Sequence, residues 1–223
     1  RLSDSAQALV SYLDAETGAA DAASSPQEEV EAFLSKHDFS FGSLETGSAT
    51  EATIAEIVET AEMLRSQAAK YIARGVLQQW ARDAAVLSLK DLRKEIETAG
   101  TDPLTLARNL HKPVVVVLRR LAALPELGAG LVVCDRSGTV IFRKSVEGFT
   151  VPRHGACCPL WPLFGALAQT GMVVTETVMQ LGRAQAQFEC FATSETQSAP
   201  SYNALPLVQA VMVLLPASAG AGQ

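Results

Sequence analysis

Residues 130–144 read Gly130-Leu131-Val132-Val133-Cys134-Asp135-Arg136-Ser137-Gly138-Thr139-Val140-Ile141-Phe142-Arg143-Lys144, and they mark where this chain changes from a helical to a strand-like pattern. Two runs rich in β-branched residues flank Asp135-Arg136-Ser137-Gly138, whose residue types favour a turn. The pattern predicts a β-hairpin with strands at 130–134 and 139–144.

Downstream of this hairpin the chain continues with strand-like segments and one helical segment. Residues 173–181 and 184–193 predict a second hairpin about Gly182-Arg183, and residues 207–215 predict a last strand rich in Val, Leu and Met. Residues 159–169 have helical spacing. Residues 126–223 are therefore expected to form an α+β domain with a five-stranded antiparallel sheet, similar to GAF or PAS sensor domains.

Upstream, residues 1–125 predict a helical linker or dimerisation region, and hence a homodimer. Apolar residues recur at steps of three and four from Ile54 to Trp80, and the pattern resumes to Ile96 before Gly100, which predicts a long amphipathic helix. Asp102 is a candidate N-cap before Pro103. Shorter helices are expected over 1–15, 27–36, 104–110 and 114–124.

Composition restricts the class of protein. The chain has 223 residues, 48% of them hydrophobic, which is enough for a large buried core. A net charge of -6 argues against this chain itself holding nucleic acid phosphates, so operator DNA is expected to bind a further N-terminal module. The apolar runs are shorter than a membrane helix, no leader is recognised, and four cysteines are too few for a disulfide scaffold, so the expected location is cytoplasmic.

Catalytic signatures are scarce, and the chain is expected not to be an enzyme. The three histidines form no His-Glu-x-x-His motif, and the sequence holds no Gly-x-Ser-x-Gly, phosphate-binding Gly-rich loop or Cys-x-x-Cys. One alternative is a nucleophile formed by Cys157 or Cys158 with His154, but no third orienting group has a recognisable spacing.

The segment from residue 148 to 162 is the candidate ligand site. Arg153 and a helix beginning at Pro159 would supply positive potential, and Gly155 would allow close approach of the backbone to an anion. Phe149, Trp161 and Phe164 would form an apolar wall. The alternative interpretation is that these aromatic residues are simply core.

The motifs in this half of the chain resemble one family. Residues 135–144, Gly148-Phe149, Pro152-Arg153 and Cys158-Pro159-Leu160-Trp161-Pro162-Leu163-Phe164 look like the C-terminal domain of the short-chain fatty acyl-CoA regulators, which are Xre-type transcription factors. The resemblance covers roughly residues 115–216. It implies a helix-turn-helix for operator DNA, a helical middle region and a sensor for short-chain acyl-CoA, with Arg153, Arg143 and Lys144 meeting the CoA phosphates.

The resemblance also raises a cysteine-based alternative, because in a mycobacterial branch this region holds a 4Fe-4S cluster. Cys158 matches the cysteine of the Cys-Pro-Leu-Trp motif, and Cys157, Cys134 and Cys190 are the other candidate ligands of a cluster or zinc. Cys134 and Cys190 lie in apolar strands, where a reduced cysteine usually behaves as a small hydrophobe. Cys157 and Cys158 could instead form a redox-responsive thiol site.

Residues 102–124 have spacing like a helix-turn-helix, with Arg108, Lys112, Arg119 and Arg120 nearby. The would-be recognition helix, 114–118, is almost wholly apolar, whereas reading bases requires several polar side chains. We interpret this segment as structural. The leading hypothesis is thus the acyl-CoA-responsive sensor of a transcription regulator, and the alternative is a redox, iron-sulfur or metal sensor.

Overall fold

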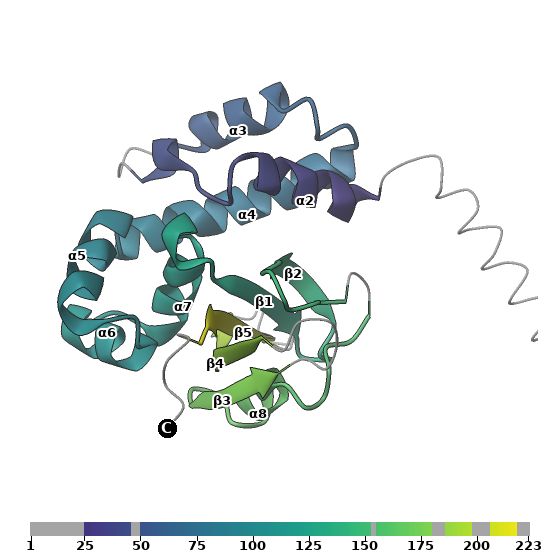
Figure 1. Ribbon diagram of the computed structural model, residues 1–223. Coiled ribbons are helices and arrows are strands. Elements are labelled where there is room, and N and C mark those ends of the chain that lie inside the picture. Colours follow the sequence, from purple (N-terminus) through teal and green to yellow (C-terminus); the bar gives the residue numbers. More distant parts are fainter. Residues whose placement is uncertain (1–24, 46–49, 153–154, 180–185, 198–205, 218–223) are drawn as a thin grey trace, which may run out of the picture. The chain divides into compact units, whose positions relative to one another are not determined.

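The computed structural model describes residues 25–45, 50–152, 155–179, 186–197 and 206–217. Figure 1 shows the elements in chain order. The helices are α2 (Pro26–Lys36), α3 (Glu51–Thr60), α4 (Gln67–Val86), α5 (Leu89–Ala99), α6 (Pro103–Leu110), α7 (Val114–Ala122) and α8 (Pro162–Ala168), with 3-10 turns η1 (Gly42–Leu44) and η2 (Pro125–Leu127). The strands are β1 (Gly130–Asp135), β2 (Val140–Lys144), β3 (Val173–Met179), β4 (Gln187–Gln197) and β5 (Leu207–Pro216). The helix expected over 1–15 lies outside the described residues.

The chain divides into two compact units. Unit 1 comprises residues 1–44 and 48–81, and unit 2 comprises residues 45–47 and 82–223. The chain therefore passes from one unit to the other near residues 44–48 and again within α4. The boundary predicted near residue 126 falls at η2, where the helices of unit 2 give way to its strands.

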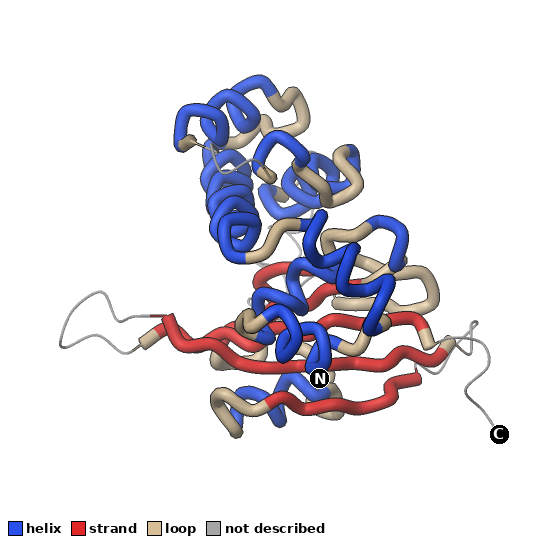
Figure 2. The backbone as a smooth tube through the Cα atoms, turned by 90° about the vertical axis from the view of Figure 1, so that its left-hand side faces the viewer, coloured by secondary structure: helices blue, strands red, loops and turns tan. Residues whose placement is uncertain are grey.

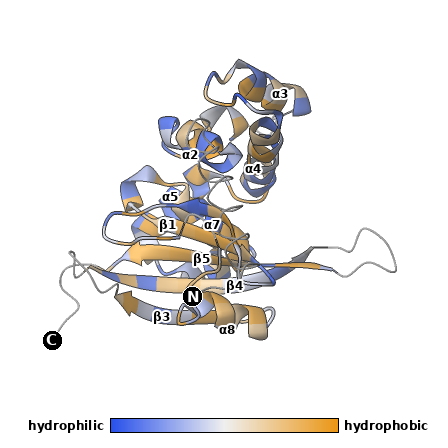
Figure 3. Cartoon of the chain, turned by 90° about the vertical axis from the view of Figure 1, so that its right-hand side faces the viewer, coloured by the Kyte–Doolittle hydropathy of each residue, from blue (hydrophilic) through white to orange (hydrophobic). Residues whose placement is uncertain are grey.

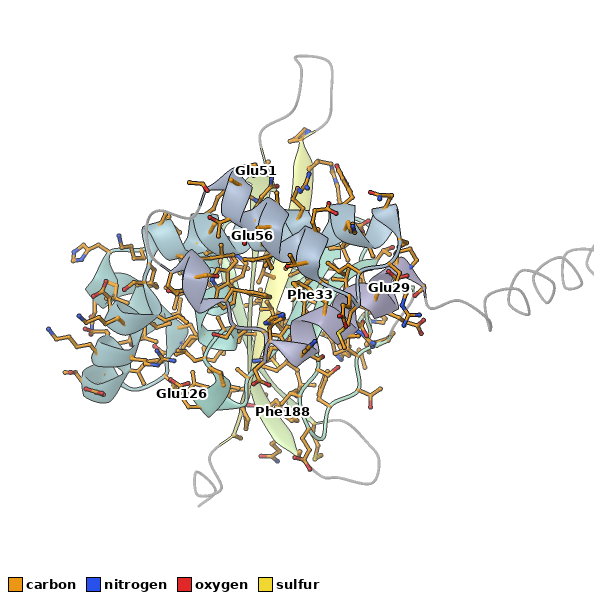
Figure 4. The ribbon with its side chains drawn as sticks, turned by 90° about the horizontal axis from the view of Figure 1, so that it is seen from above. Glu29, Phe33, Glu51, Glu56, Glu126 and Phe188 are labelled. Carbon is orange, nitrogen blue, oxygen red and sulfur yellow. The ribbon has the colours of Figure 1, made fainter. Side chains whose placement is uncertain are left out.

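In unit 1, α2 begins with a capping box. The Ser25 hydroxyl accepts from the Glu28 backbone N–H, and the Glu28 carboxylate accepts from the Ser25 N–H, which satisfies two donors that a helix start leaves unpaired. Phe33 on α2 is buried and stacks on Phe41, whose ring meets that of Trp80 edge-on. Figure 4 shows Glu29 and Phe33 on α2.

The periodic segment from residue 53 to 99 forms three helices rather than one continuous helix. Glu29 is the reason for the first break: its carboxylate accepts hydrogen bonds from the backbone N–H groups of Arg65 and Ser66, at 2.6 and 2.9 Å. The Ser66 hydroxyl accepts from Ala69 N–H, so α4 restarts there. Ser88 likewise caps α5 through the Asp91 N–H. The prediction of one long amphipathic helix is therefore wrong, and the longest of the three helices is α4, with 20 residues.

Helices α6 and α7 of unit 2 begin where the sequence predicts. Asp102 caps α6 by accepting from Thr105 N–H at 2.8 Å, and Pro103 follows at the first helical position. In α7, Val116, Val117 and Leu118 are buried. Because the apolar residues of α7 lie inside the unit rather than at its surface, they are core residues, in agreement with the structural interpretation of 102–124.

Five antiparallel strands form the sheet of unit 2, in the order β2-β1-β5-β4-β3 (Figure 2). The expected α+β class is confirmed, as is the first hairpin. Strands β3 and β4 pair antiparallel as predicted, and the turn expected at Gly182-Arg183 lies outside the described residues. The central strand β5 is buried from Ala210 to Leu215, and Figure 3 shows hydrophobic residues concentrated on the central strands and α8. Among the described residues no helix has the length and apolar character required to cross a membrane.

The two faces of the sheet have different coverings, because successive side chains of a strand point to opposite sides. The first, here called the motif face, carries Val132, Phe188 and Met212 and is covered by α8 and by residues 149–152 and 155–161. The second, the helix face, is covered by α7. Two neighbours on β4 illustrate the division: Ser194 bonds to Ala166 of α8, and Glu195 pairs with Arg119 of α7.

Candidate functional site

Hydrogen bonds to the Asp135 side chain hold the β1–β2 turn of the candidate site. Asp135 Oδ1 accepts hydrogen bonds from the Ser137 N–H at 2.8 Å, the Ser137 hydroxyl at 2.6 Å and the Thr139 N–H at 3.0 Å. The bond from the Ser137 hydroxyl is the main reason that the pKa of the Asp135 carboxyl lies below its usual range. The turn is therefore held in one conformation.

Gly138 in this turn is in direct contact with the aromatic ring of Phe164. Its φ is +81°, and a Cβ at this position would lie 2.5 Å from Phe164 Cζ. The backbone carbonyl of Gly138 also accepts from Cys157 N–H at 2.8 Å, and the Val140 N–H donates to the Gly155 carbonyl at 3.1 Å. The motif segment 155–157 thus runs along β2.

Phe149 and Trp161 meet on the motif face, as the proposed apolar wall requires. Their ring centroids are 5.2 Å apart, and Phe149 makes an edge-on contact with Phe188 of β4 at 5.5 Å. The three side chains are buried, with 4%, 8% and 1% exposure. Phe188 was not predicted as a site residue, although its alternation along the expected strand 184–193 could have indicated it. Phe164 packs against the same cluster from α8.

The predicted phosphate-binding cations do not lie together. Arg143 is paired with Val132 in the β1–β2 register, so its side chain is on the motif face, whereas Lys144 is paired with Leu131. Arg143 Nη1 donates to the Val151 carbonyl, and Lys144 Nζ donates to the Ala122 carbonyl at the end of α7, each at 2.6 Å. Only Arg143 therefore shares a face with the aromatic cluster.

The other parts of the predicted anion site change in the structure or lie outside it. The helix expected from Pro159 begins at Pro162 and has seven residues, with no side-chain cap at Trp161. Leu160, which precedes it, is 83% exposed. A helix this short adds little positive potential at its start. Gly155 is exposed with φ +92°, and Arg153 and His154 lie outside the described residues.

The cysteines form one close pair rather than a group of four. Cys134 and Cys157 are near enough for a thiol–thiol hydrogen bond, which lowers the pKa of the Cys157 thiol and, with burial, raises that of Cys134. Cys134 is paired with Ala210 of β5 and Cys190 with Leu214. These positions differ by four residues, about 13 Å along the strand, and by two strand spacings of about 4.8 Å.

That separation explains why Cys134 and Cys190 cannot bind the same small metal centre. Burial raises the pKa of the Cys190 thiol to about 12, which disfavours the thiolate that a metal needs. Cys158 is half-buried. Within the described residues no group of three or more His, Cys, Asp or Glu could hold a metal ion. The predicted ligand set Cys134, Cys157, Cys158 and Cys190 is not brought together, and a 4Fe-4S cluster has no support from the described geometry.

Comparison with known proteins identifies the class of this region. Residues 125–219 match the family model described as the C-terminal region of the short-chain fatty acyl coenzyme A regulator. The resemblance drawn from the Cys-Pro-Leu-Trp segment is thereby confirmed, and residues 125–219 are similar to the C-terminal domain of this family.

The fold is also found in a solved structure. A Mycobacterium tuberculosis transcriptional regulator is similar over 74% of this chain with a TM-score of 0.57 and 23% sequence identity. The match covers 51% of that regulator, so this chain spans about half of its length. No curated protein matches the sequence.

Proposed function

We propose that residues 126–223 sense a short-chain acyl-CoA for a transcription regulator. The observation that carries the proposal is the motif face: within the region that matches the acyl-CoA regulator family, Phe149 and Trp161 form an apolar cluster on the same sheet face as Arg143. An apolar surface beside a cation suits a ligand that joins a short acyl chain to a phosphorylated nucleotide.

The proposed roles follow from the chemistry of each residue. Phe149, Trp161 and Phe164 would contact the acyl and pantetheine groups, and Arg143 and Arg153 would meet CoA phosphates, with Gly155 allowing close backbone approach. Lys144 has a weaker case, because it donates to Ala122 from the opposite face. Operator DNA would be bound by another part of the regulator, since this chain carries a net charge of -6. A homodimer in the cytoplasm remains our prediction.

Calorimetry with acetyl-CoA, propionyl-CoA and free CoA tests the proposal. We expect a saturable heat with at least one thioester, and about tenfold weaker binding in Arg143→Gln, equivalent to about 1.4 kcal/mol. Arg136→Gln is the matched control, because Arg136 is exposed in the neighbouring turn. An absence of heat with all three compounds at about 1 mM would refute the acyl-CoA assignment.

A thiol redox sensor is the second candidate, and the Cys134–Cys157 hydrogen bond is the observation that favours it. With hydrogen peroxide as oxidant, the two thiols would form one disulfide and lose two hydrogens, while the peroxide is reduced to two water molecules. Intact mass after peroxide treatment would show the loss of two hydrogens in the native protein and not in Cys157→Ser. Retention of all four thiols under peroxide would reject this candidate.

A further inference from the structure

Arg119 of α7 connects the sheet to the end of α4. Its guanidinium donates to both carboxylate oxygens of Asp83, at 2.7 and 2.9 Å, and to Glu195 of β4 at 2.6 Å. The side chains of Arg119, Asp83 and Glu195 are 12%, 6% and 26% exposed. Burial lowers the pKa of Arg119, but the hydrogen bonds and charges of both carboxylates outweigh this effect and raise the pKa. Arg119 therefore stays protonated.

The next residue, Arg120, holds a second carboxylate. It is 1% exposed and donates through Nη2 to both oxygens of Glu45, at 2.7 and 2.5 Å. Glu45 Oε2 also accepts from the backbone N–H of Leu89 at the start of α5. Glu45 therefore joins Arg120 of α7 to the start of α5.

Arg119 and Arg120 both bind carboxylates next to places where the chain passes between the two units. The chain passes between the two units near residues 44–48 and again at residues 81–82, inside α4. Arg120 binds Glu45, the first residue of unit 2 at one passage, and Arg119 binds Asp83, the second residue of unit 2 at the other. Two of the three junctions with unit 1, those next to Glu45 and Asp83, are therefore held within unit 2 by neighbouring side chains of one helix.

Strand β4 links this arrangement to the motif face. The Ser194 hydroxyl is buried and donates to the Ala166 carbonyl of α8 at 2.8 Å, on the motif face. Glu195 follows directly and meets Arg119 on the opposite face. A shift of α8 along its contact with β4 therefore reaches Arg119 through one peptide unit.

We propose that Arg119 and Arg120 act as a coupling clamp, which transmits displacements of α8 and β4 to the two chain segments that enter unit 1. A displacement of β4 would reach Arg119 through Glu195, and it would reach the two chain segments through Asp83 and Glu45. The existence of this coupling does not depend on the ligand, but its use in sensing rests on the proposed function. Arg119 binds carboxylates on two different elements, Asp83 of α4 and Glu195 of β4. A displacement of either element therefore changes the position of Arg119, which is what coupling between two sites requires.

A purely structural role makes a different prediction. If Arg119 only fills space and neutralises charge, then removing the Glu195 charge changes the local exchange of β4 and leaves α4 unaltered. If the clamp couples them, the same change loosens the last turn of α4, where the Leu87 N–H donates to the Asp83 carbonyl at 2.8 Å. Amide exchange distinguishes the two because it reports local opening residue by residue.

The test is hydrogen exchange of the full chain without ligand, comparing Glu195→Gln with Glu189→Gln. Glu189 is exposed and lies on the same strand and the same face as Glu195, so Glu189→Gln is a matched control. We expect exchange in the last turn of α4, residues 83–87, to be at least about fivefold faster in Glu195→Gln and unchanged in Glu189→Gln. Equal exchange at these residues in both variants would overturn the proposal.

A reciprocal variant keeps the proposal falsifiable if Glu195→Gln unfolds. Asp83→Asn is expected to accelerate exchange at residues 193–196 of β4, since coupling acts in both directions. Acyl-CoA binding then separates the two claims: binding that persists in Glu195→Gln without protection of α4 supports the clamp, whereas an absence of binding in the native chain contradicts the proposed ligand alone. No effect of Asp83→Asn on β4 would overturn the clamp.

Discussion

Replacing Gly138 by alanine tests whether the contact between the β1–β2 turn and α8 determines the stability of unit 2. Gly138 has φ +81°, and an added Cβ would lie 2.5 Å from Phe164 Cζ and 2.8 Å from Cε1. The substitution therefore has two separate costs, one from the backbone and one from the ring. Gly171 has a similar φ of +84°, but nothing lies within 4 Å of its added Cβ, so Gly171→Ala isolates the backbone cost.

The magnitudes can be worked from these contacts. Left-handed backbone costs alanine about 1–2 kcal/mol, and the less flexible unfolded chain returns about 0.4–1 kcal/mol. Gly171→Ala should thus lower the free energy of unfolding by about 0–1.5 kcal/mol. Displacing the Phe164 ring from a packed position adds about 1–3 kcal/mol. We expect Gly138→Ala to lose about 1–4.5 kcal/mol, and always more than Gly171→Ala.

Urea unfolding followed by Trp161 fluorescence measures this difference. Trp80 belongs to unit 1, so a Trp80→Phe background restricts the signal to unit 2. A third variant identifies the ring as the cause: Phe164→Leu in the Gly138→Ala background should recover part of the loss, because the contacting atoms Cζ and Cε1 are absent. Equal losses in Gly138→Ala and Gly171→Ala, or additive effects of Gly138→Ala and Phe164→Leu, would refute the reasoning.

Three further predictions address other parts of the chain. Arg120→Ala should lower the free energy of unfolding by about 3–5 kcal/mol because it removes the buried partner of Glu45, whereas Arg108→Ala, at an exposed site of α6, should change it little in the same urea titration. Cys134→Ala should raise the pKa of the Cys157 thiol, because the hydrogen bond with Cys134 lowers it. The thiolate absorbance at about 240 nm would then appear at higher pH than in the native protein. An unchanged titration curve of this absorbance would contradict the thiol pair. Glu29 accepts a backbone hydrogen bond from Ser66 that lowers the pKa of Glu29 below the ordinary 4.5. The stabilisation of unit 1 by the Glu29 carboxylate is therefore present above pH 4.5 and is lost as pH falls through the lower folded pKa. Glu29→Gln should remove this pH dependence in acid titrations followed by Trp80 fluorescence, and an unchanged profile would exclude Glu29 as its source.

Local patterns in the sequence predicted the elements of unit 2 well. The turn residues 135–138 placed the first hairpin, and Asp102 with Pro103 placed the start of α6, because turns and caps are determined by a few neighbouring residues. The break before α4 could not be predicted in this way. It depends on Glu29, which accepts from Ser66 at a distance of 37 residues in the sequence.

The positions of the candidate site residues also depend on contacts between distant parts of the sequence, although one of them could have been predicted from strand alternation. The separation of Cys134 from Cys190 follows from the strand order β1-β5-β4, which no local pattern contains. The opposite placement of Arg143 and Lys144, however, follows from strand alternation alone and was available from the predicted strand 139–144. Their joint assignment to one phosphate site should have been questioned from the sequence.

The burial of the aromatic cluster has a consequence for how an effector could act. Phe149, Trp161 and Phe188 are almost fully buried, so an acyl group can reach them only if the described residues of this segment, 149–152 and 155–161, move away from the sheet. Two contacts hold this segment near β2: the Cys157 N–H bond to Gly138 and the Arg143 bond to Val151. An effector that replaces these contacts binds the displaced state in preference to the packed one, and it can shift α8 against Ser194 only by this difference in affinity. On this argument, variants that loosen the segment should bind the effector more tightly and respond to it less.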